Sequence, residues 1–257
     1  SNDAESTVAS AADGGTGYRK FVMAGPSDPG NYLPFNADNS VRQTYSIFFY
    51  EYLFDLFGTG DMRPTIASGF ERTGEGVYVV KLRQNVHDHN GEPITASDVV
   101  FSFEQPIAIG ERTSSLGEIA AVKKIEDYTV EFNMEPDLLG SFERAMTSTP
   151  IVSQKSYEAS STGFSSDPVG TGPYYIANWT PGASLTLKKD ENYWGKDEGF
   201  NNQNLDEIEV KFIAEPAQVA IELETGNVDF AYNTSSKDAD SFVGKAGFTV
   251  TNKPFAQ

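Results

Sequence analysis

Two short segments carry the residue types from which anion or metal sites are built. Gly170-Thr171-Gly172 could open a loop whose backbone amides hold a phosphate, and His87 and His89 flank an acidic residue. A dinucleotide-binding loop, however, needs a third glycine and then a helix, whereas here Pro173 removes an amide and Tyr175 stands where that glycine would be. The two histidines share one face of an extended segment, and no third ligand is close in sequence. We therefore interpret both segments as turns and predict neither a cofactor nor a metal site.

The sequence contains no recognised signature of an enzyme. It has no cysteine, which excludes thiol nucleophiles and zinc thiolates, and no Gly-x-Ser-x-Gly elbow. Gly195-Lys196 and Gly244-Lys245 are not followed by serine or threonine, so neither is a P-loop. Paired carboxylates say little about glycosidase chemistry in a chain this rich in acidic residues. We predict a protein without catalytic residues; a hydrolase is the alternative that a broad substrate screen would test.

The composition is that of a folded, acidic protein. The 257 residues are 39% hydrophobic and 12% aromatic, and a chain of this length can bury about 70–75% of its unfolded surface. With 37 acidic and 19 basic residues the formal net charge is −18, which argues against a nucleic-acid partner. No run approaches the roughly 18 apolar residues of a membrane span. Residues 1–17 are small and polar, so we expect a flexible leader, with any secretion signal already removed.

Hydrophobic periodicity places several secondary-structure elements. An aromatic stripe at helical spacing predicts a helix, and its members are Val41, Tyr45, Phe48, Phe49, Tyr52 and Leu56. A second helix should begin at Thr95, because Asp98 three positions later completes a capping box. Residues rich in β-branched types or alternating in polarity predict strands at 18–24 and 77–83, a hairpin near 124–134, and a hairpin over 174–188.

The clearest pattern is a strand–helix–strand unit near the C-terminal end of the sequence. Glu207–Ile213 alternates apolar and charged side chains, Pro216–Glu224 has the composition of a helix with proline at its first position, and Val228–Ala231 resumes as a strand. Short links between a strand, a helix and a strand require parallel pairing in one sheet. We expect Tyr18–Ala24 to join that sheet, with Pro216–Glu224 crossing over it.

Three motifs in the same order resemble a known family. They are VKLR at 80–83 with HNGEPITASDVVFS at 89–102, VGTGPY at 169–174 with NYWG at 192–195, and LETGNVD at 223–229. Together they resemble the family 5 extracellular solute-binding proteins, the peptide-, dipeptide- and nickel-binding receptors of ABC importers. Asp88 departs from the family, which has an aromatic residue there. Family members are also much longer, so the resemblance covers their first lobe.

The resemblance implies a fold and a function. The fold is a mixed α/β, periplasmic-binding-protein-like lobe with a mixed central sheet, in which a core (18–47 and 168–257) carries an inserted α+β subdomain (48–167), the second lobe being absent from this chain. The function is capture of a peptide or similar small solute in a two-lobed cleft and delivery to a membrane ABC permease. The protein would be extracytoplasmic and a monomer at full length, with lipid anchoring through a removed N-terminal segment left open. A sensor of the same fold that feeds no transporter is the alternative.

Ligands of open α/β sheets bind beyond the carboxyl ends of parallel strands, and two loops leave such strands here. The family resemblance implies the same two loops. The residues expected to contact the ligand are Ser27, Asp28, Gly30 and Asn31 after the first strand, and Tyr232, Asn233 and Thr234 after the last.

Some of these residues also have a purely structural interpretation. Asp28 and its neighbour Pro29 are good turn formers, and Thr234 could cap a following helix. Tyr45 and Tyr50 are weaker ligand candidates, because an aromatic stripe at helical spacing is more often part of the core. For Asn233 and Tyr232 we favour a ligand contact, since an amide both donates and accepts and a phenol can stack while it bonds.

Overall fold

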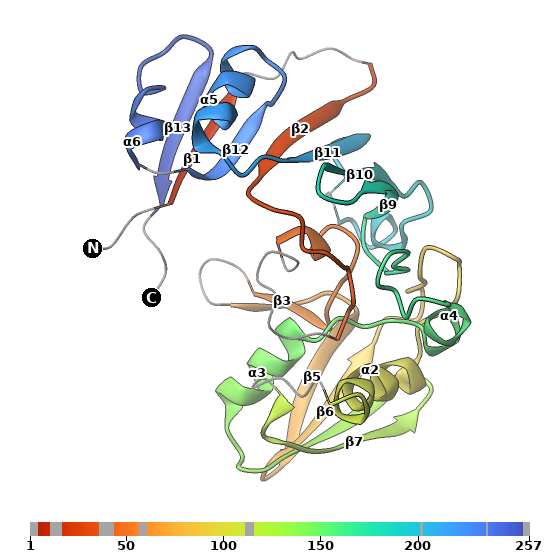
Figure 1. The fold of residues 1–257 in the computed structure, drawn as a ribbon. Helices are drawn as coiled ribbons and strands as arrows, with labels where there is room; N and C mark the ends of the chain where they lie inside the picture. The colour runs from red at the N-terminus through yellow and green to blue at the C-terminus, as the bar shows by residue number, and fades with distance from the viewer. Residues whose placement is uncertain are drawn as a thin grey trace. The chain divides into compact units, whose positions relative to one another are not determined.

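The computed structural model describes residues 5–10, 17–35, 44–56, 61–110, 116–200, 203–234 and 236–253. They divide into two compact units (Figure 1). Unit 1 comprises residues 1–30, 176–189 and 203–257, and unit 2 comprises residues 31–175 and 190–202, in each case as far as they are described. By this division the described residues of 31–47, 168–173 and 190–202 group with the inserted segment and not with the core sheet, and the boundary between the units falls within β9 (Tyr174–Thr180), after Tyr175.

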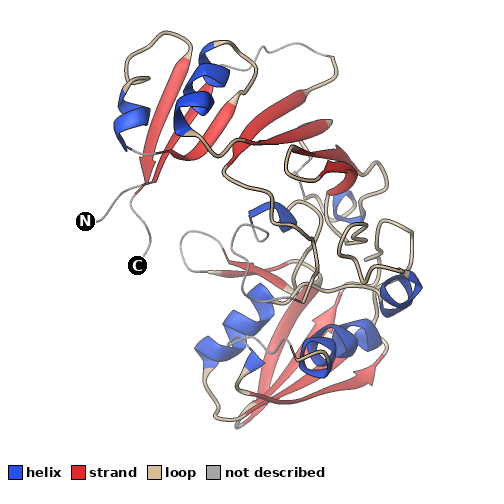
Figure 2. Cartoon of the chain, in the orientation of Figure 1, coloured by secondary structure: helices blue, strands red, loops and turns tan. Residues whose placement is uncertain are grey.

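Unit 1 is built on a seven-stranded mixed sheet with the strand order β13-β1-β12-β2-β11-β10-β9. Figure 2 draws the strands in red and the helices in blue. Its strands are β1 (Glu5–Ser10), β2 (Lys20–Gly25), β9 (Tyr174–Thr180), β10 (Ser184–Lys189), β11 (Glu207–Phe212), β12 (Phe230–Thr234) and β13 (Phe248–Lys253). Its helices are α5 (Pro216–Glu224) and α6 (Ser236–Asp240).

The predicted strand–helix–strand unit is confirmed. β2 pairs in parallel with β11 on one side and with β12 on the other, so α5 carries the chain across β2 from one neighbour to the next. Val210 is fully buried in β11, and Leu223 of α5 is buried in a core cluster with Val228 and Phe242. The apolar face of α5 and the alternation in β11 are what hold this crossover on the sheet.

The expected leader is wrong for residues 5–10, which form β1 inside the sheet. β1 pairs antiparallel with β12 on one side and with β13 on the other. Its small polar side chains gave no hydrophobic pattern, but a strand with neighbours on both edges is held by backbone hydrogen bonds that need no particular side chain. The partners of β1 lie more than 200 residues away in sequence, so no local signal could announce the pairing.

Unit 2 contains a four-stranded antiparallel sheet, β5-β6-β8-β7, and a two-stranded ribbon, β3-β4. Its strands are β3 (Phe54–Leu56), β4 (Met62–Pro64), β5 (Ala67–Gly74), β6 (Val77–Leu82), β7 (Ile119–Glu126) and β8 (Thr129–Met134). Its helices are α2 (Ala96–Ala108), α3 (Leu139–Ser148), α4 (Gln154–Ala159) and the short 3₁₀ helix η2 (Trp194–Lys196). α2 packs on β7 and β8 (Figure 1).

The predicted start of α2 and the predicted hairpin are both confirmed. Thr95 is the N-cap of α2, and the Asp98 carboxylate accepts a hydrogen bond from the Thr95 amide at 2.8 Å. β7 and β8 form the hairpin expected near residues 124–134. Among the helices of the described ranges, none has both the length and the apolar character needed to cross a membrane.

The helix predicted over 41–56 is wrong. In its described part only residues 44–46 are helical; the chain then turns, and β3 begins at Phe54. Val41 lies outside the described residues. Tyr45 and Phe49 are fully buried as members of a core stripe would be, whereas Phe48 and Tyr52 are half-buried and Leu56 is exposed. The backbone, however, forms hydrogen bonds with distant segments, as when the Leu53 carbonyl accepts from the Thr65 and Ala67 amides. Tertiary pairing therefore overrides the helical spacing.

Candidate functional site

The three parallel strands of unit 1 end at one edge of the sheet. Phe212 of β11 lies beside Gly25 of β2, and Ala231 of β12 lies beside Ala24 of β2. The Ile213 amide donates to the Gly25 carbonyl at 2.8 Å, which carries the pairing one residue beyond the strands. Segments that leave this carboxyl edge can present side chains and backbone groups to a ligand. We call it the carboxyl edge of unit 1.

The loop after β2, residues 26–31, leaves from this edge as predicted. Ser27 is exposed, and Gly30 is exposed with a φ of 76°, a left-handed conformation that favours glycine. Asn31 is half-buried, and its side-chain oxygen accepts a hydrogen bond from the Leu33 amide at 3.3 Å. Ser27 and Gly30 are therefore placed where a ligand could reach them, and Asn31 also shapes the turn that follows.

Asp28 is committed to contacts within unit 1. One carboxylate oxygen accepts from the Gly30 amide at 2.8 Å. The other accepts from the Trp179 indole nitrogen at 3.2 Å and from the Gly182 amide at 2.5 Å. These last two groups belong to β9 and to the turn before β10, more than 150 residues away in sequence. The turn-forming interpretation of Asp28 thus holds, and the contact reaches much farther than its own loop.

Tyr232, Asn233 and Thr234 lie in β12 itself, which corrects the expectation that they form a loop after it. Thr234 pairs with Ser6 of β1, so the strand continues for as long as β1 supplies a partner. β12 continues beyond the part that pairs with β2, because the last pair between the two strands is Ala231 with Ala24. The three residues therefore occupy the carboxyl end of β12, at the predicted edge. Their side chains lie outside the described part.

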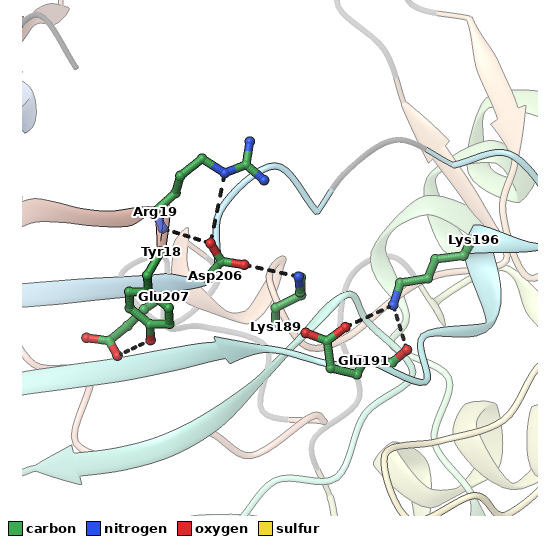
Figure 3. A network of polar contacts seen from close by, with 7 residues as sticks. All are labelled: Tyr18, Arg19, Lys189, Glu191, Lys196, Asp206 and Glu207. Atoms are coloured by element: carbon green, nitrogen blue, oxygen red, sulfur yellow. Dashed lines mark hydrogen bonds and ion pairs between the residues drawn. The ribbon is translucent and has the colours of Figure 1, made fainter. Parts of the chain in front are cut away.

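Salt bridges gather at the opposite, amino edge of the same strands. Asp206 accepts from the Arg19 amide at 2.7 Å and from the Lys189 ammonium at 3.1 Å, and Tyr18 donates to Glu207 at 2.8 Å (Figure 3). The hydrogen bond from the Arg19 amide, with help from Lys189, lowers the pKa of Asp206 below its usual range. These contacts fix the register of β2, β10 and β11 from the end that faces away from the candidate site.

Figure 3 also shows an ion pair of unit 2, in which Lys196 approaches Glu191 at 3.6 Å. The Lys196 ammonium also donates to the Glu191 carbonyl at 2.6 Å. Both side chains are well exposed, so the pair contributes little to stability.

The glycines of the Gly170-Thr171-Gly172 turn are required by a close backbone approach, which the sequence did not reveal. A Cβ on Gly170 would lie 1.8 Å from the Phe49 carbonyl oxygen, and one on Gly172 would lie 2.7 Å from the Phe49 carbonyl carbon. The Gly172 amide donates to that Phe49 oxygen at 3.0 Å. As predicted, the turn leads into a strand, since β9 begins at Tyr174.

His89 joins the first family motif to this turn. Its Nε2 lies 2.9 Å from the Gly172 carbonyl oxygen, and its Nδ1 accepts from the Gly170 amide at 3.3 Å. The ring is therefore neutral with the proton on Nε2, and burial lowers its pKa. His87 lies 3.1 Å from the Asp88 carbonyl oxygen through Nδ1. Within the described ranges no three potential metal ligands come together.

Sequence reasoning missed a buried carboxyl group at Glu51. Its two oxygens accept from the Tyr193 hydroxyl at 2.5 Å and from the Trp194 indole nitrogen at 3.0 Å. The Trp194 nitrogen also donates to the Thr171 carbonyl at 2.9 Å. Burial raises the pKa of Glu51 to about 8, so at neutral pH the carboxyl is mostly protonated. The motifs at 169–174 and 192–195 therefore meet at one buried acid inside unit 2.

The weaker candidates are part of the core. Tyr45 is fully buried, and Tyr50 is buried with its hydroxyl donating to the Tyr32 carbonyl at 3.0 Å. The family motifs of unit 2 thus build a scaffold, whereas Ser27, Gly30 and the end of β12 lie at the carboxyl edge of unit 1. One indirect indication of Glu51 was present in the sequence. If Tyr193 and Trp194 are buried, the hydroxyl and the indole N–H need a buried acceptor, which Glu51 provides.

Comparison with known proteins agrees with this architecture. Residues 61–256 match the family described as bacterial extracellular solute-binding proteins, family 5, middle. The oligopeptide-binding protein AppA of Bacillus subtilis is 28% identical over 178 residues, covering 65% of this chain and 32% of AppA. The glutathione-binding protein GsiB of Escherichia coli is 26% identical over 219 residues, covering 83% of this chain and 42% of GsiB. The chain thus spans less than half the length of these relatives.

Solved structures show the same fold. AppA in complex with a nonapeptide superposes with a TM-score of 0.74 at 21% identity, covering 82% of this chain and 44% of AppA. The periplasmic oligopeptide-binding protein of an ABC transporter from Thermotoga maritima, with bound mannohexaose, superposes with a TM-score of 0.77 at 24% identity, covering 89% of this chain and 44% of that protein. The mixed α/β, periplasmic-binding-protein-like fold expected from the sequence is confirmed.

Proposed function

Because this chain belongs to the family 5 bacterial extracellular solute-binding proteins, we propose that it forms part of the extracytoplasmic receptor of an ABC importer. The receptor captures a peptide or a similar small solute and delivers it to a membrane permease. The observation that carries the proposal is the carboxyl edge of unit 1, where three parallel strands end together and two candidate ligand segments leave or terminate. Related proteins bind peptides, glutathione or a mannose oligosaccharide by their names, so the ligand class is a polar oligomer.

The ligand wall of the proposal consists of two segments with different chemistry. Ser27 and Gly30 offer a hydroxyl and an exposed backbone on the loop after β2, and the next residue, Asn31, carries an amide. Tyr232, Asn233 and Thr234 offer a phenol, an amide and a hydroxyl at the end of β12. Peptides and glycans both present dense donors and acceptors, which such groups can satisfy when water is excluded. The formal charge of −18 adds no basic surface that would favour an anionic polymer.

The full-length receptor, of which this chain is a part, would act as a monomer in the periplasm or at the cell surface. Two lobes would close around the ligand by a hinge motion, and the closed form would be the one that the permease recognises. Closure excludes water and brings polar groups from both sides onto the ligand, and this is the source of affinity. No step of this mechanism requires a cofactor or a reacting side chain.

The test starts from the full-length protein. Native mass spectrometry identifies what co-purifies with it, and calorimetry then measures di- to nonapeptides, glutathione and mannohexaose. Asn233→Ala and Tyr232→Ala should each weaken the tightest ligand about tenfold, the value of one lost hydrogen bond to a polar ligand. The control Val243→Ala, at a side chain that is 64% exposed, should leave affinity unchanged. Equal affinity in all three variants at unchanged melting temperature would contradict the assignment of this edge, and absence of any binding would contradict the function.

A further inference from the structure

The carboxylate of Asp28 connects two parts of the carboxyl edge that are not neighbours in the sheet. Asp28 follows β2, whereas its partners Trp179 and Gly182 belong to the hairpin of β9 and β10. In the strand order, β11 lies between β2 and β10. Adjacent strands are about 4.8 Å apart, so the loop after β2 must cross the end of β11 before Asp28 can reach Gly182.

The register places the hairpin turn at the same edge. Ser184, the first residue of β10, lies beside Lys211 of β11, and Lys211 lies beside Ala24 of β2. The Phe212 amide donates to the Ala183 carbonyl at 2.9 Å, which holds the turn against the end of β11. The turn before β10 is therefore held in place by β11, and the hydrogen bonds of Asp28 connect the loop after β2 to this turn.

The direction of this attachment matters for the second candidate segment. β12 lies on the other side of β2 from β11 and β10. Asp28 thus draws the loop toward β10, away from the carboxyl end of β12, where Tyr232, Asn233 and Thr234 are found. A loop freed from Gly182 would no longer be confined to one side of β2.

We propose that Asp28 is a positioning residue for ligand binding: through Trp179 and Gly182 it holds the loop of residues 26–30 on the β10 side of the carboxyl edge, so that Ser27 and Gly30 are preordered and the end of β12 stays accessible. This inference rests on the proposed function, and it reassigns Asp28 from contacting the ligand to holding the loop that does. Preordering lowers the entropic cost of binding and allows fast association, since no loop rearrangement has to precede it.

The binding test uses the full-length protein and, as probe, the tightest of the di- to nonapeptides. Asp28→Ala should weaken the probe about tenfold, chiefly through a slower association rate, because the loop must first be ordered. Trp179→Phe removes the indole donor and leaves a smaller aromatic ring in its place, and it should weaken the probe less. The double variant should bind no more weakly than Asp28→Ala alone, because both changes break one interaction. The control Asp240→Ala, at an exposed acid in α6, should bind as the unchanged protein does.

A second measurement needs no ligand. Hydrogen exchange of the Gly30 and Gly182 amides should accelerate in Asp28→Ala and stay slow in Asp240→Ala, because these two amides donate to the Asp28 carboxylate. Unchanged exchange in Asp28→Ala would overturn the inference whether or not any peptide binds. Faster exchange in Asp28→Ala with unchanged affinity and association rate would also overturn it. So would a double variant whose loss of binding free energy equals the sum of the losses in Asp28→Ala and Trp179→Phe. Failure of the unchanged protein to bind any peptide would instead count against the proposed function.

Discussion

The buried Glu51 should make unit 2 sensitive to alkaline pH, and Glu51→Gln should remove that sensitivity. Burial raises the pKa of Glu51 from 4.5 to about 8, so the folded state binds this proton more tightly than the unfolded chain does. The stability that the group contributes is complete below its unfolded pKa and is lost as the pH rises through its folded pKa. Proton linkage between these two values removes about 4 kcal/mol between pH 5 and pH 9.

The variant isolates this effect because its amide does not titrate. The Tyr193 hydroxyl can still donate to the glutamine oxygen, whereas the Trp194 indole nitrogen would face the amide nitrogen and lose one acceptor. That loss costs about 1 kcal/mol at every pH, and Trp194 retains its bond to the Thr171 carbonyl. The difference in unfolding free energy between the two proteins should therefore shift by about 4 kcal/mol in favour of the variant from pH 5 to pH 9.

The assay is urea unfolding at several pH values, followed by tryptophan fluorescence. The chain has two tryptophans, so a Trp179→Phe background leaves Trp194 as a reporter within unit 2. Burial also raises the pKa of Asp55, but that residue is present in both proteins and largely cancels in the difference. Glu71→Gln, at an exposed position of β5, is the control. Its difference in unfolding free energy from the unchanged protein should be the same at pH 5 and pH 9. A pH-dependent change below about 1 kcal/mol in the Glu51 comparison would refute the reasoning.

Three further outcomes follow from the packing. Gly170→Ala should destabilise the protein by about 3 kcal/mol or prevent folding, because its Cβ would lie 1.8 Å from a backbone oxygen, whereas Gly69→Ala, with open space around it, should shift the melting temperature little. Burial lowers the pKa of His89, so the stability that neutral His89 contributes is complete above its unfolded pKa of about 6.5 and is lost as the pH falls below it. The melting temperature should therefore fall less on acidification in His89→Gln than in the unchanged protein. Val210→Ala should cost about 2 kcal/mol in urea unfolding for the buried cavity it leaves, against less than about 0.5 kcal/mol for the exposed Val243→Ala.

The sequence alone determined those elements whose signals are local. The alternation in β11, the proline at the start of α5 and the capping box at Thr95 each lie within a few residues, so the crossover and α2 were predicted correctly. The carboxyl edge followed from these elements, because parallel strands that share a sheet end on the same side. Ordered motifs also identified the family, since each motif is a contiguous stretch.

Only the tertiary structure decided the contacts that join distant segments. β1 carries no hydrophobic pattern and is a strand because β12 and β13 supply backbone partners. β1 in turn is the partner that extends β12 through Thr234. The aromatic residues before β3 have helical spacing, yet the backbone carbonyl of Tyr52 accepts from Ile66 after β4, and the backbone carbonyls of Phe48 and Phe49 accept from Tyr174 and Gly172. Glu51 stays protonated because it is buried against an aromatic pair more than 140 residues away in sequence. The proposed role of Asp28 depends on a hairpin more than 150 residues away. Backbone pairing, close approach and desolvation depend on what lies opposite in space, and a local pattern of residue types does not encode that.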